Sequence, residues 1–173
     1  MMNFFKNIQV KKGFSLIETI VYIAIFSAFI GALVTFALNI NTSRLKTQTM
    51  LEVKGQGADL MRILTNSVKN ATAINYPGTG LSSGTLSVDM SDTLVNPTIF
   101  SGSGEAIYIT EGANSAIALT NNKVKVTDLS FTNVSKINTP GVIQIRFTIS
   151  NTALQTLPEQ QYSINFYGTA SLR

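Results

Sequence analysis

The first long feature of the chain is an apolar run from Phe14 to Ile40, which contains one charged residue, Glu18, and no proline. A helix that crosses the hydrocarbon of a bilayer needs about 20 mostly apolar residues, so this run predicts one transmembrane helix over 14–40. Lys6, Lys11 and Lys12 precede it, with no acidic residue among them. By the positive-inside rule, we expect the N-terminus inside the cell and the rest of the chain outside.

A second helical pattern follows the apolar run. No proline occurs before Pro77, and Pro77-Gly78 is a strong stop signal. Apolar and small residues recur at helical spacing: Met50, Gly57, Met61, Leu64, Val68 and Ala71. We therefore expect an amphipathic helix over 41–76 whose stripe packs on the protein's own sheet. Gly55 and Gly57 each weaken a helix by about 1 kcal/mol, which predicts a bend or local melting there.

The residues over 77–173 predict a β-rich head, because Ser, Thr, Asn and Gly alternate there with short apolar runs. The clearest strand is 142–150, where apolar residues alternate on one face: Ile143, Ile145, Phe147 and Ile149. The run 161–167 repeats this pattern after a loop around Pro158. We expect these two strands to pair antiparallel against the helix.

Shorter strands and one hairpin are also expected in the head. The apolar runs over 85–90, 98–100 and 106–110 are typical of short strands. Asn121-Asn122 tolerates the positive φ of a two-residue turn. We therefore expect a β-hairpin that joins 115–120 to 123–126.

The composition excludes several chemistries. The 173 residues include no Cys and no His, so a catalytic thiolate, a thiolate or imidazole zinc site, a Ser-His-Asp relay and a disulfide are all excluded. The acidic residues of the head lack the short, ordered spacing of a calcium loop: Asp89, Asp92, Glu105, Glu111 and Asp128. We expect no cofactor, no metal ion and no catalytic residue, and the chain is not expected to be an enzyme.

The charge distribution argues against DNA binding. The chain has 13 basic and 9 acidic residues, but from Phe14 onward the counts are 10 and 9, which leaves 10 − 9 = +1. Several aromatic residues of the head could resemble a stacking platform for single-stranded nucleic acid: Phe131, Phe147, Tyr162, Phe166 and Tyr167. Basic residues near them are sparse, and the period of two places most of these rings in the core. DNA binding is not expected.

The start of the apolar run carries the most specific signal. Gly13 ends a short basic leader, Phe14 follows at once, and the single charge, Glu18, comes one helical turn later. A carboxylate at the bilayer centre costs about 2.5–3.5 kcal/mol, so Glu18 needs a partner or a functional reason, and nothing within the span is expected to offer a partner. On hydropathy alone the segment is a signal anchor that keeps its whole N-terminus. In that case Glu18 reaches toward the interface.

The segment Gly13-Phe14-Ser15-Leu16-Ile17-Glu18 resembles the class III signal of type IV prepilins and pseudopilins. The resemblance implies cleavage after Gly13 by a prepilin peptidase, methylation of the new N-terminal Phe14, and a role for Glu18 in subunit registration. It also implies an α+β fold: a long N-terminal helix, half transmembrane and half amphipathic, packed on an antiparallel β-sheet head. Residues 1–13 would then be a leader peptide.

The resemblance implies a structural, non-enzymatic subunit of a type IV pilus or a type II secretion-like filament. A minor rather than a major subunit is favoured by the compact head with scattered strand signals and by residues 166–173, which are loosely similar to the C-termini of minor pilins and pseudopilins. Its expected partners are the peptidase, other pilin or pseudopilin subunits, the inner-membrane assembly platform, and membrane lipid before assembly. The expected location is the inner membrane as a single-pass protein, and an extracellular or periplasmic filament after assembly. The alternative is a membrane-anchored binding protein or adhesin that never polymerises.

Overall fold

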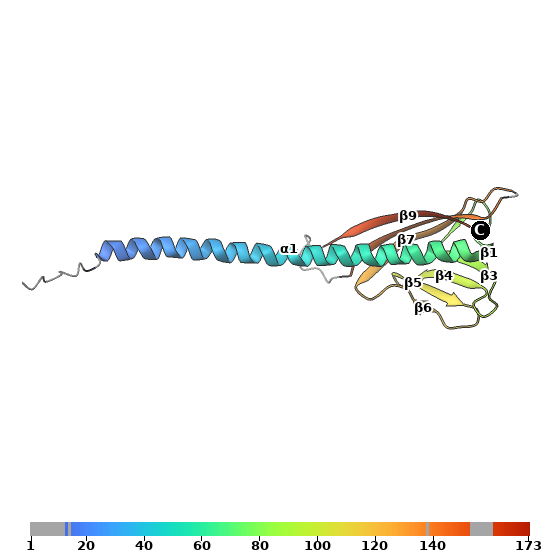
Figure 1. Cartoon of the computed structure of the whole chain (residues 1–173), viewed down its shortest axis with the longest axis horizontal. Helices are drawn as coiled ribbons and strands as arrows, with labels where there is room; N and C mark the ends of the chain where they lie inside the picture. Colours follow the sequence, from blue (N-terminus) through green and yellow to red (C-terminus); the bar gives the residue numbers. More distant parts are fainter. Residues whose placement is uncertain (1–12, 14, 138, 153–160) are drawn as a thin grey trace, which may run out of the picture. The chain divides into compact units, whose positions relative to one another are not determined.

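The computed structural model describes residue 13 and residues 15–137, 139–152 and 161–173. The expected leader up to Lys12, Phe14 and the loop around Pro158 lie outside these described residues. The chain divides into two compact units, Met1–Arg44 and Leu45–Arg173. One helix, α1 (Leu16–Asn70), contributes residues to both units, and strands of the second unit lie above and below its later part in Figure 1.

The described strands form two antiparallel sheets. Sheet A has the order β1-β3-β4-β5-β6, and sheet B has the order β2-β7-β8-β9. The strands are β1 (Ala71–Tyr76), β2 (Ser82–Ser83), β3 (Thr85–Met90), β4 (Thr98–Ser103), β5 (Ala106–Glu111), β6 (Ile117–Ala118), β7 (Val124–Asn133), β8 (Val142–Asn151) and β9 (Ser163–Ser171). A long N-terminal helix followed by two antiparallel sheets confirms the predicted α+β fold class.

The second half of α1 supplies one side of the core. Its buried residues are Val53, Gly57, Leu60, Leu64 and Val68. The predicted stripe therefore has the correct face, although it lacks the buried Val53 and Leu60. The predicted melting at Gly55 and Gly57 is wrong, because α1 continues through both positions.

The expected helical segment 41–76 is wrong over its last six residues. Helix α1 ends at Asn70, and Ala71–Tyr76 forms strand β1. β1 pairs antiparallel with β3, and the Thr72 hydroxyl donates to the Asp89 carbonyl at 3.2 Å. The ladder with β3 pairs backbone groups of Ala71–Tyr76 that would otherwise bond within a helix.

Strands β8 and β9 confirm the strongest strand predictions. Ile143, Ile145, Phe147 and Ile149 on β8 are fully buried. β9 pairs antiparallel with β8, with Phe166 opposite Phe147. The two rings stack with their centroids 5.2 Å apart, and Phe166 also lies against α1 at Gly57. The pair therefore packs against the helix as expected.

The short strands over 85–90, 98–100 and 106–110 are also present, as β3, β4 and β5. The predicted hairpin at Asn121-Asn122 is wrong, because β6 joins sheet A while β7 joins sheet B. Asn121 still makes a turn, in which its side-chain oxygen accepts from the Lys123 N–H at 3.0 Å. Its amide donates to Glu52 on α1 at 3.1 Å, which fixes the turn against the helix. The turn connects β6 of sheet A to β7 of sheet B.

Candidate functional site

Gly13, one of the two predicted processing residues, lies in an open position before α1. The Ser15 carbonyl accepts the hydrogen bond from the Thr19 N–H at 3.2 Å, so Ser15 is the residue at which the helix begins to form. Gly13 is exposed, and a Cβ built on it would meet nothing within 4 Å. Phe14 lies outside the described residues. In the sequence, two residues, Phe14 and Ser15, separate the Gly13-Phe14 bond from the first helical residue, Leu16.

Glu18 lies in the first turn of α1 and is exposed. A carboxylate there interacts favourably with the positive end of the helix dipole, typically by about 0.3–1 kcal/mol at an exposed site. Glu18 also has a hydrogen-bond partner within the span, because the Tyr22 hydroxyl donates to its Oε1 at 3.2 Å. The expectation that the span offers Glu18 no partner is therefore wrong. The i,i+4 spacing, which places two side chains on one helix face, could have predicted this contact.

Apolar side chains on the first half of α1 are exposed. Leu16 is 79% exposed, and Phe26 and Phe29 are 65% and 60% exposed. Among the described residues, α1 is the one helix that is long and apolar enough to cross a membrane, and none of its most apolar window is buried. These side chains therefore require lipid or other protein chains around them.

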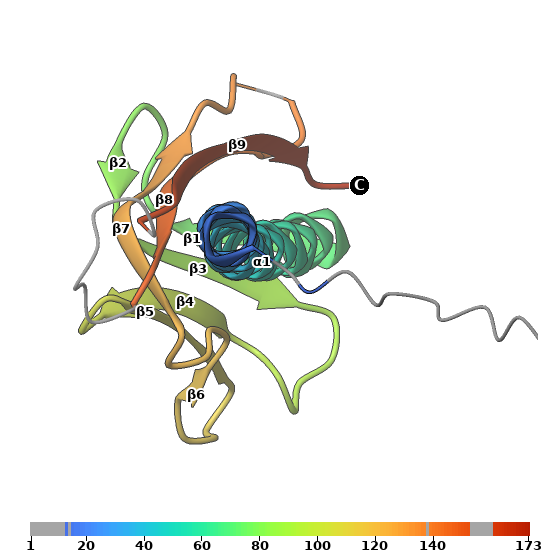
Figure 2. The ribbon, with the colours of Figure 1, turned by 90° about the vertical axis from the view of Figure 1, so that its left-hand side faces the viewer.

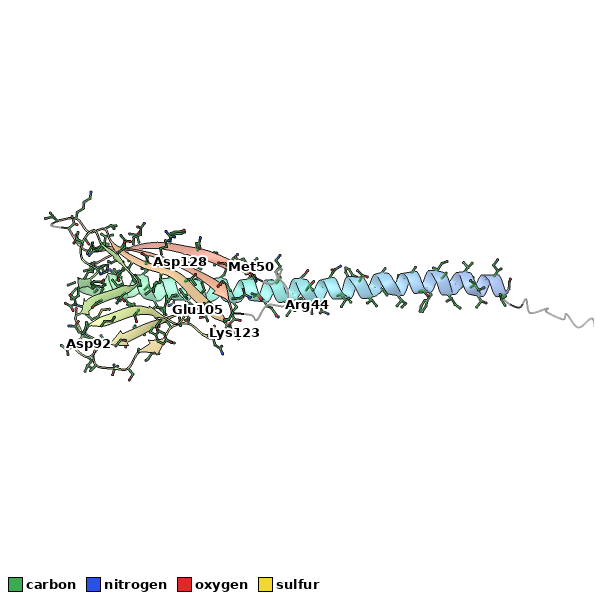
Figure 3. The ribbon with its side chains drawn as sticks, turned by 180° about the vertical axis from the view of Figure 1, so that it is seen from behind. Arg44, Met50, Asp92, Glu105, Lys123 and Asp128 are labelled. Carbon is green, nitrogen blue, oxygen red and sulfur yellow. The ribbon has the colours of Figure 1, made fainter. Side chains whose placement is uncertain are left out.

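Three acidic residues of the head make hydrogen bonds or an ion pair within the head. Asp89 accepts from the Asn75 amide at 2.6 Å, and Asp92 accepts from the Leu94 N–H at 2.9 Å. Glu105 pairs with Lys125 at 2.7 Å. Figure 3 shows Asp92 at the end of the head opposite Lys123. Within the described residues, no three acidic side chains gather in a group that could hold a metal ion.

One concave site in the head was not predicted from the sequence. It has a volume of about 450 Å³ and is lined by α1, the turn before β7 and the end of β8, with Glu52, Val53 and Lys123 among the lining residues. The Lys123 ammonium lies 3.5 Å from Glu52 Oε2. An exposed pair of this kind contributes about 0–1 kcal/mol. This contact joins the turn before β7 to α1.

The N-terminal residues match a known family model. The model describes the prokaryotic N-terminal methylation motif, and the match covers residues 9–34. The chain carries the signature of type IV pilins and pseudopilins. The matched range of this pilin-type motif includes Gly13, Phe14 and Glu18. No curated protein and no solved structure matches the chain.

The pilin-type motif agrees with the exposure of the apolar side chains on the first half of α1. The motif supports a subunit of the pilin or pseudopilin type that a prepilin peptidase processes and that assembles with other subunits. Such subunits are structural proteins rather than enzymes. The motif and the apolar first half of α1 together fit a single-pass anchor in the inner membrane.

Proposed function

We propose that this chain is a minor structural subunit of a type IV pilus or a type II secretion-like filament. The observation that carries the proposal is the methylation motif over 9–34, which lies at the start of a helix whose apolar side chains are exposed. Before assembly, these side chains lie in membrane lipid. After assembly, they pack against the helices of other subunits, with the head outside the cytoplasm.

Processing at Gly13 changes the electrostatics of the helix start. The peptidase hydrolyses the Gly13-Phe14 peptide bond, so a neutral amide nitrogen becomes a charged N-terminal amine on Phe14. Methylation of this nitrogen keeps its positive charge. The open surroundings of Gly13 support access by the peptidase. The processed chain thus places a cation four residues before Glu18.

Glu18 then sets the register between subunits. Its carboxylate pairs with the Phe14 amine of a neighbouring subunit, which neutralises two charges that an apolar filament core would otherwise penalise by several kcal/mol each. The assembly platform in the inner membrane moves each subunit out of the lipid. Formation of this charge pair then fixes the axial position of the subunit in the filament. The Tyr22 hydroxyl holds the carboxylate on one face of the helix during this step.

Replacement of the cleavage residue tests the proposal. In Gly13→Leu, the bulky side chain should block cleavage, so the leader should stay attached and incorporation into filaments should fall at least tenfold. N-terminal mass spectrometry of membrane and filament fractions measures both effects. The matched control is Gly55→Ala, because Gly55 also has nothing within 4 Å of a Cβ but lies in the head. This control should be processed normally.

The same measurement on the natural chain separates the two candidate functions. A chain that begins at methylated Phe14 supports the filament subunit. A chain that keeps Met1 in cells with an active prepilin peptidase supports the membrane-anchored adhesin and contradicts our proposal. The abundance of the processed chain relative to the other subunits of the filament then tests the minor role.

A further inference from the structure

Strand β9 is the terminal strand of sheet B. In the order β2-β7-β8-β9, its one sheet neighbour among the described strands is β8. β9 is nine residues long, and its register with β8 runs from Ser163 to Ser171 without a shift. Figure 2 shows β9 arching over α1, with β8 and β7 on one side of it. One backbone edge of β9 therefore has no strand beside it in the described head.

Main-chain bonds near both ends of β9 identify the groups on that edge. The Leu172 N–H donates to the Gly141 carbonyl at 2.8 Å, and the Asn151 N–H donates to the Tyr162 carbonyl at 3.2 Å. Backbone groups alternate sides along a strand, so even-numbered residues bond to β8 and odd-numbered residues face away from it. The residues that face the open edge are Ser163, Asn165, Tyr167, Thr169 and Ser171.

This edge lacks the features that normally protect a strand. Proteins shield sheet edges with short strands, charged residues, proline or bulges, because an open edge pairs readily with other chains. The edge strands β2 and β6 have two residues each, and β1 has two register shifts and is followed by Pro77. β9 contains no charge, no proline and no register shift. Among the described strands, β9 alone combines length with an unprotected edge.

A second copy of this chain does not fit the edge. β9 runs parallel to α1, because Phe166 lies at Gly57 and Gly168 lies at Met61, further along both elements. Antiparallel pairing of two β9 edges would reverse one α1 relative to the other. Parallel pairing would place the two helices on opposite faces of one sheet. Neither arrangement lets two α1 helices lie side by side in one direction, which the proposed filament requires.

The surroundings of the edge define the partner that fits it. On the outer face, the side chains of β9 are uncharged and exposed. On the inner face, an exposed row of α1 lies beside Gly57 and Met61 and contains Lys54, Ala58 and Arg62. The Arg62 guanidinium already pairs with Asp59 on the same helix at 3.3 Å, and Lys54 adds a second positive charge to the row. A strand added at the edge would cover this row. Its inward side chains must therefore be small, with an acidic one opposite Lys54, and its outward ones uncharged.

We propose that the open edge of β9 binds an extended strand of a different subunit by β-strand addition. The outward N–H and C=O groups of β9 form the main-chain hydrogen bonds, and the alternating side chains of the added strand set specificity. This inference rests on the proposed function, because the partner belongs to the same assembly. It adds a second subunit interface, in the head, to the one along the apolar helices.

Hydrogen exchange of the full chain tests this interface. The protein is compared in native assemblies from cells and as the purified chain in detergent, with exchange resolved to single residues by mass spectrometry. In detergent, the even-numbered amides of β9 should be protected by β8 and the odd-numbered amides should exchange quickly. In assemblies, the odd-numbered amides should slow at least tenfold. Unchanged exchange at the odd positions would overturn the proposal.

A proline variant separates strand addition from simple burial. Thr169→Pro removes one outward N–H and no bond to β8, and the preceding Gly168 tolerates the restriction that proline imposes. In assemblies of this variant, the protection of Asn165, Tyr167 and Ser171 should also be lost. The control Thr169→Ala keeps the N–H and should keep the protection. Protection that survives Thr169→Pro would show burial without strand pairing and would overturn the inference.

Two further measurements on the same samples serve as controls, one for folding and one for N-terminal processing. Protected even-numbered amides of Thr169→Pro in detergent would verify that sheet B is still folded. N-terminal mass spectrometry of the assemblies separates this inference from the proposed function. A methylated Phe14 with unprotected odd amides would overturn the β9 interface alone, whereas an intact Met1 with unprotected odd amides would overturn both.

Discussion

At the scale of single residues, the hydroxyl of Tyr22 changes the energetic problem that Glu18 poses. An isolated carboxylate in lipid lacks hydrogen-bond donors, and water is not available to replace them. The Tyr22 hydroxyl supplies one donor from the same helix face at 3.2 Å. Glu18 can therefore be partly solvated by its own chain before a neighbouring Phe14 amine reaches it.

This contact predicts different effects for two substitutions. Glu18→Ala should still be cleaved but should assemble poorly, because the charge pair is lost. Tyr22→Phe should also be cleaved, and its assembly should fall roughly two- to tenfold, since a hydrogen bond to a charged group contributes about 1.5–3 kcal/mol and this one is exposed in the single chain. The ratio of processed chain in filament and membrane fractions, measured by quantitative immunoblotting, gives both effects.

The matched control for Tyr22→Phe is Tyr76→Phe, which removes a hydroxyl from a half-exposed tyrosine in the head. This control should assemble as the natural chain does. If Tyr22→Phe assembles normally while Glu18→Ala does not, the hydroxyl has no role in holding the carboxylate.

At the scale of elements, the head depends on a close approach between α1 and β9. A Cβ at Gly57 would lie 2.1 Å from Phe166 Cε2 and 2.4 Å from its Cζ. The ring cannot easily move away, because it stacks on the fully buried Phe147. Gly57 therefore marks a close contact between helix and strand, and the packing gained there offsets its low helix propensity.

This approach predicts opposite effects for two neighbouring glycines. Gly57→Ala should lower the free energy of unfolding of the head by about 1–3 kcal/mol, because the added methyl group overpacks the contact with Phe166. Gly55→Ala should raise it by about 0.5–1 kcal/mol, because that position is open and alanine favours the helix. Urea unfolding followed by tyrosine fluorescence compares the two. Equal effects of the two substitutions would contradict the contact.

The elements also show how far local pattern predicts structure. The period-two alternation over 142–150 predicts β8, because its side chains are buried on one face only. The glycine content of α1 predicts melting at Gly57, but the contact with Phe166 lies more than a hundred residues away in the chain. The Asn121-Asn122 pair correctly predicts a turn, but the neighbouring strands join different sheets. Sheet membership depends on long-range pairing that no short pattern contains.

At the scale of the whole molecule, the two units differ in how much of their function could be predicted. The processing residues lie within six consecutive positions, so their order and spacing are enough to indicate the motif. The open edge of β9 could not be predicted in this way. It results from the order of strands in sheet B and from the direction of β9 along α1.

The division into two units predicts that the head folds without the first half of α1. The unit Leu45–Arg173 has its own core, in which Leu60 and Leu64 of α1 pack with Phe100, Phe131 and Phe147 of the sheets. A fragment of residues 45–173 should therefore be soluble and should unfold in one cooperative transition. The change in unfolding free energy caused by Gly57→Ala should agree with that in the full chain within about 0.5 kcal/mol, because that contact lies inside the unit.

The same fragment separates folding from assembly. It lacks Gly13, Phe14 and Glu18 and the exposed apolar side chains that follow them, so it should not enter filaments. Urea unfolding by circular dichroism and sedimentation of filament fractions measure the two properties. A fragment that shows no cooperative transition would contradict an independent head. A folded fragment that is incorporated at the level of the natural chain would show that the apolar helix is not needed to join the assembly.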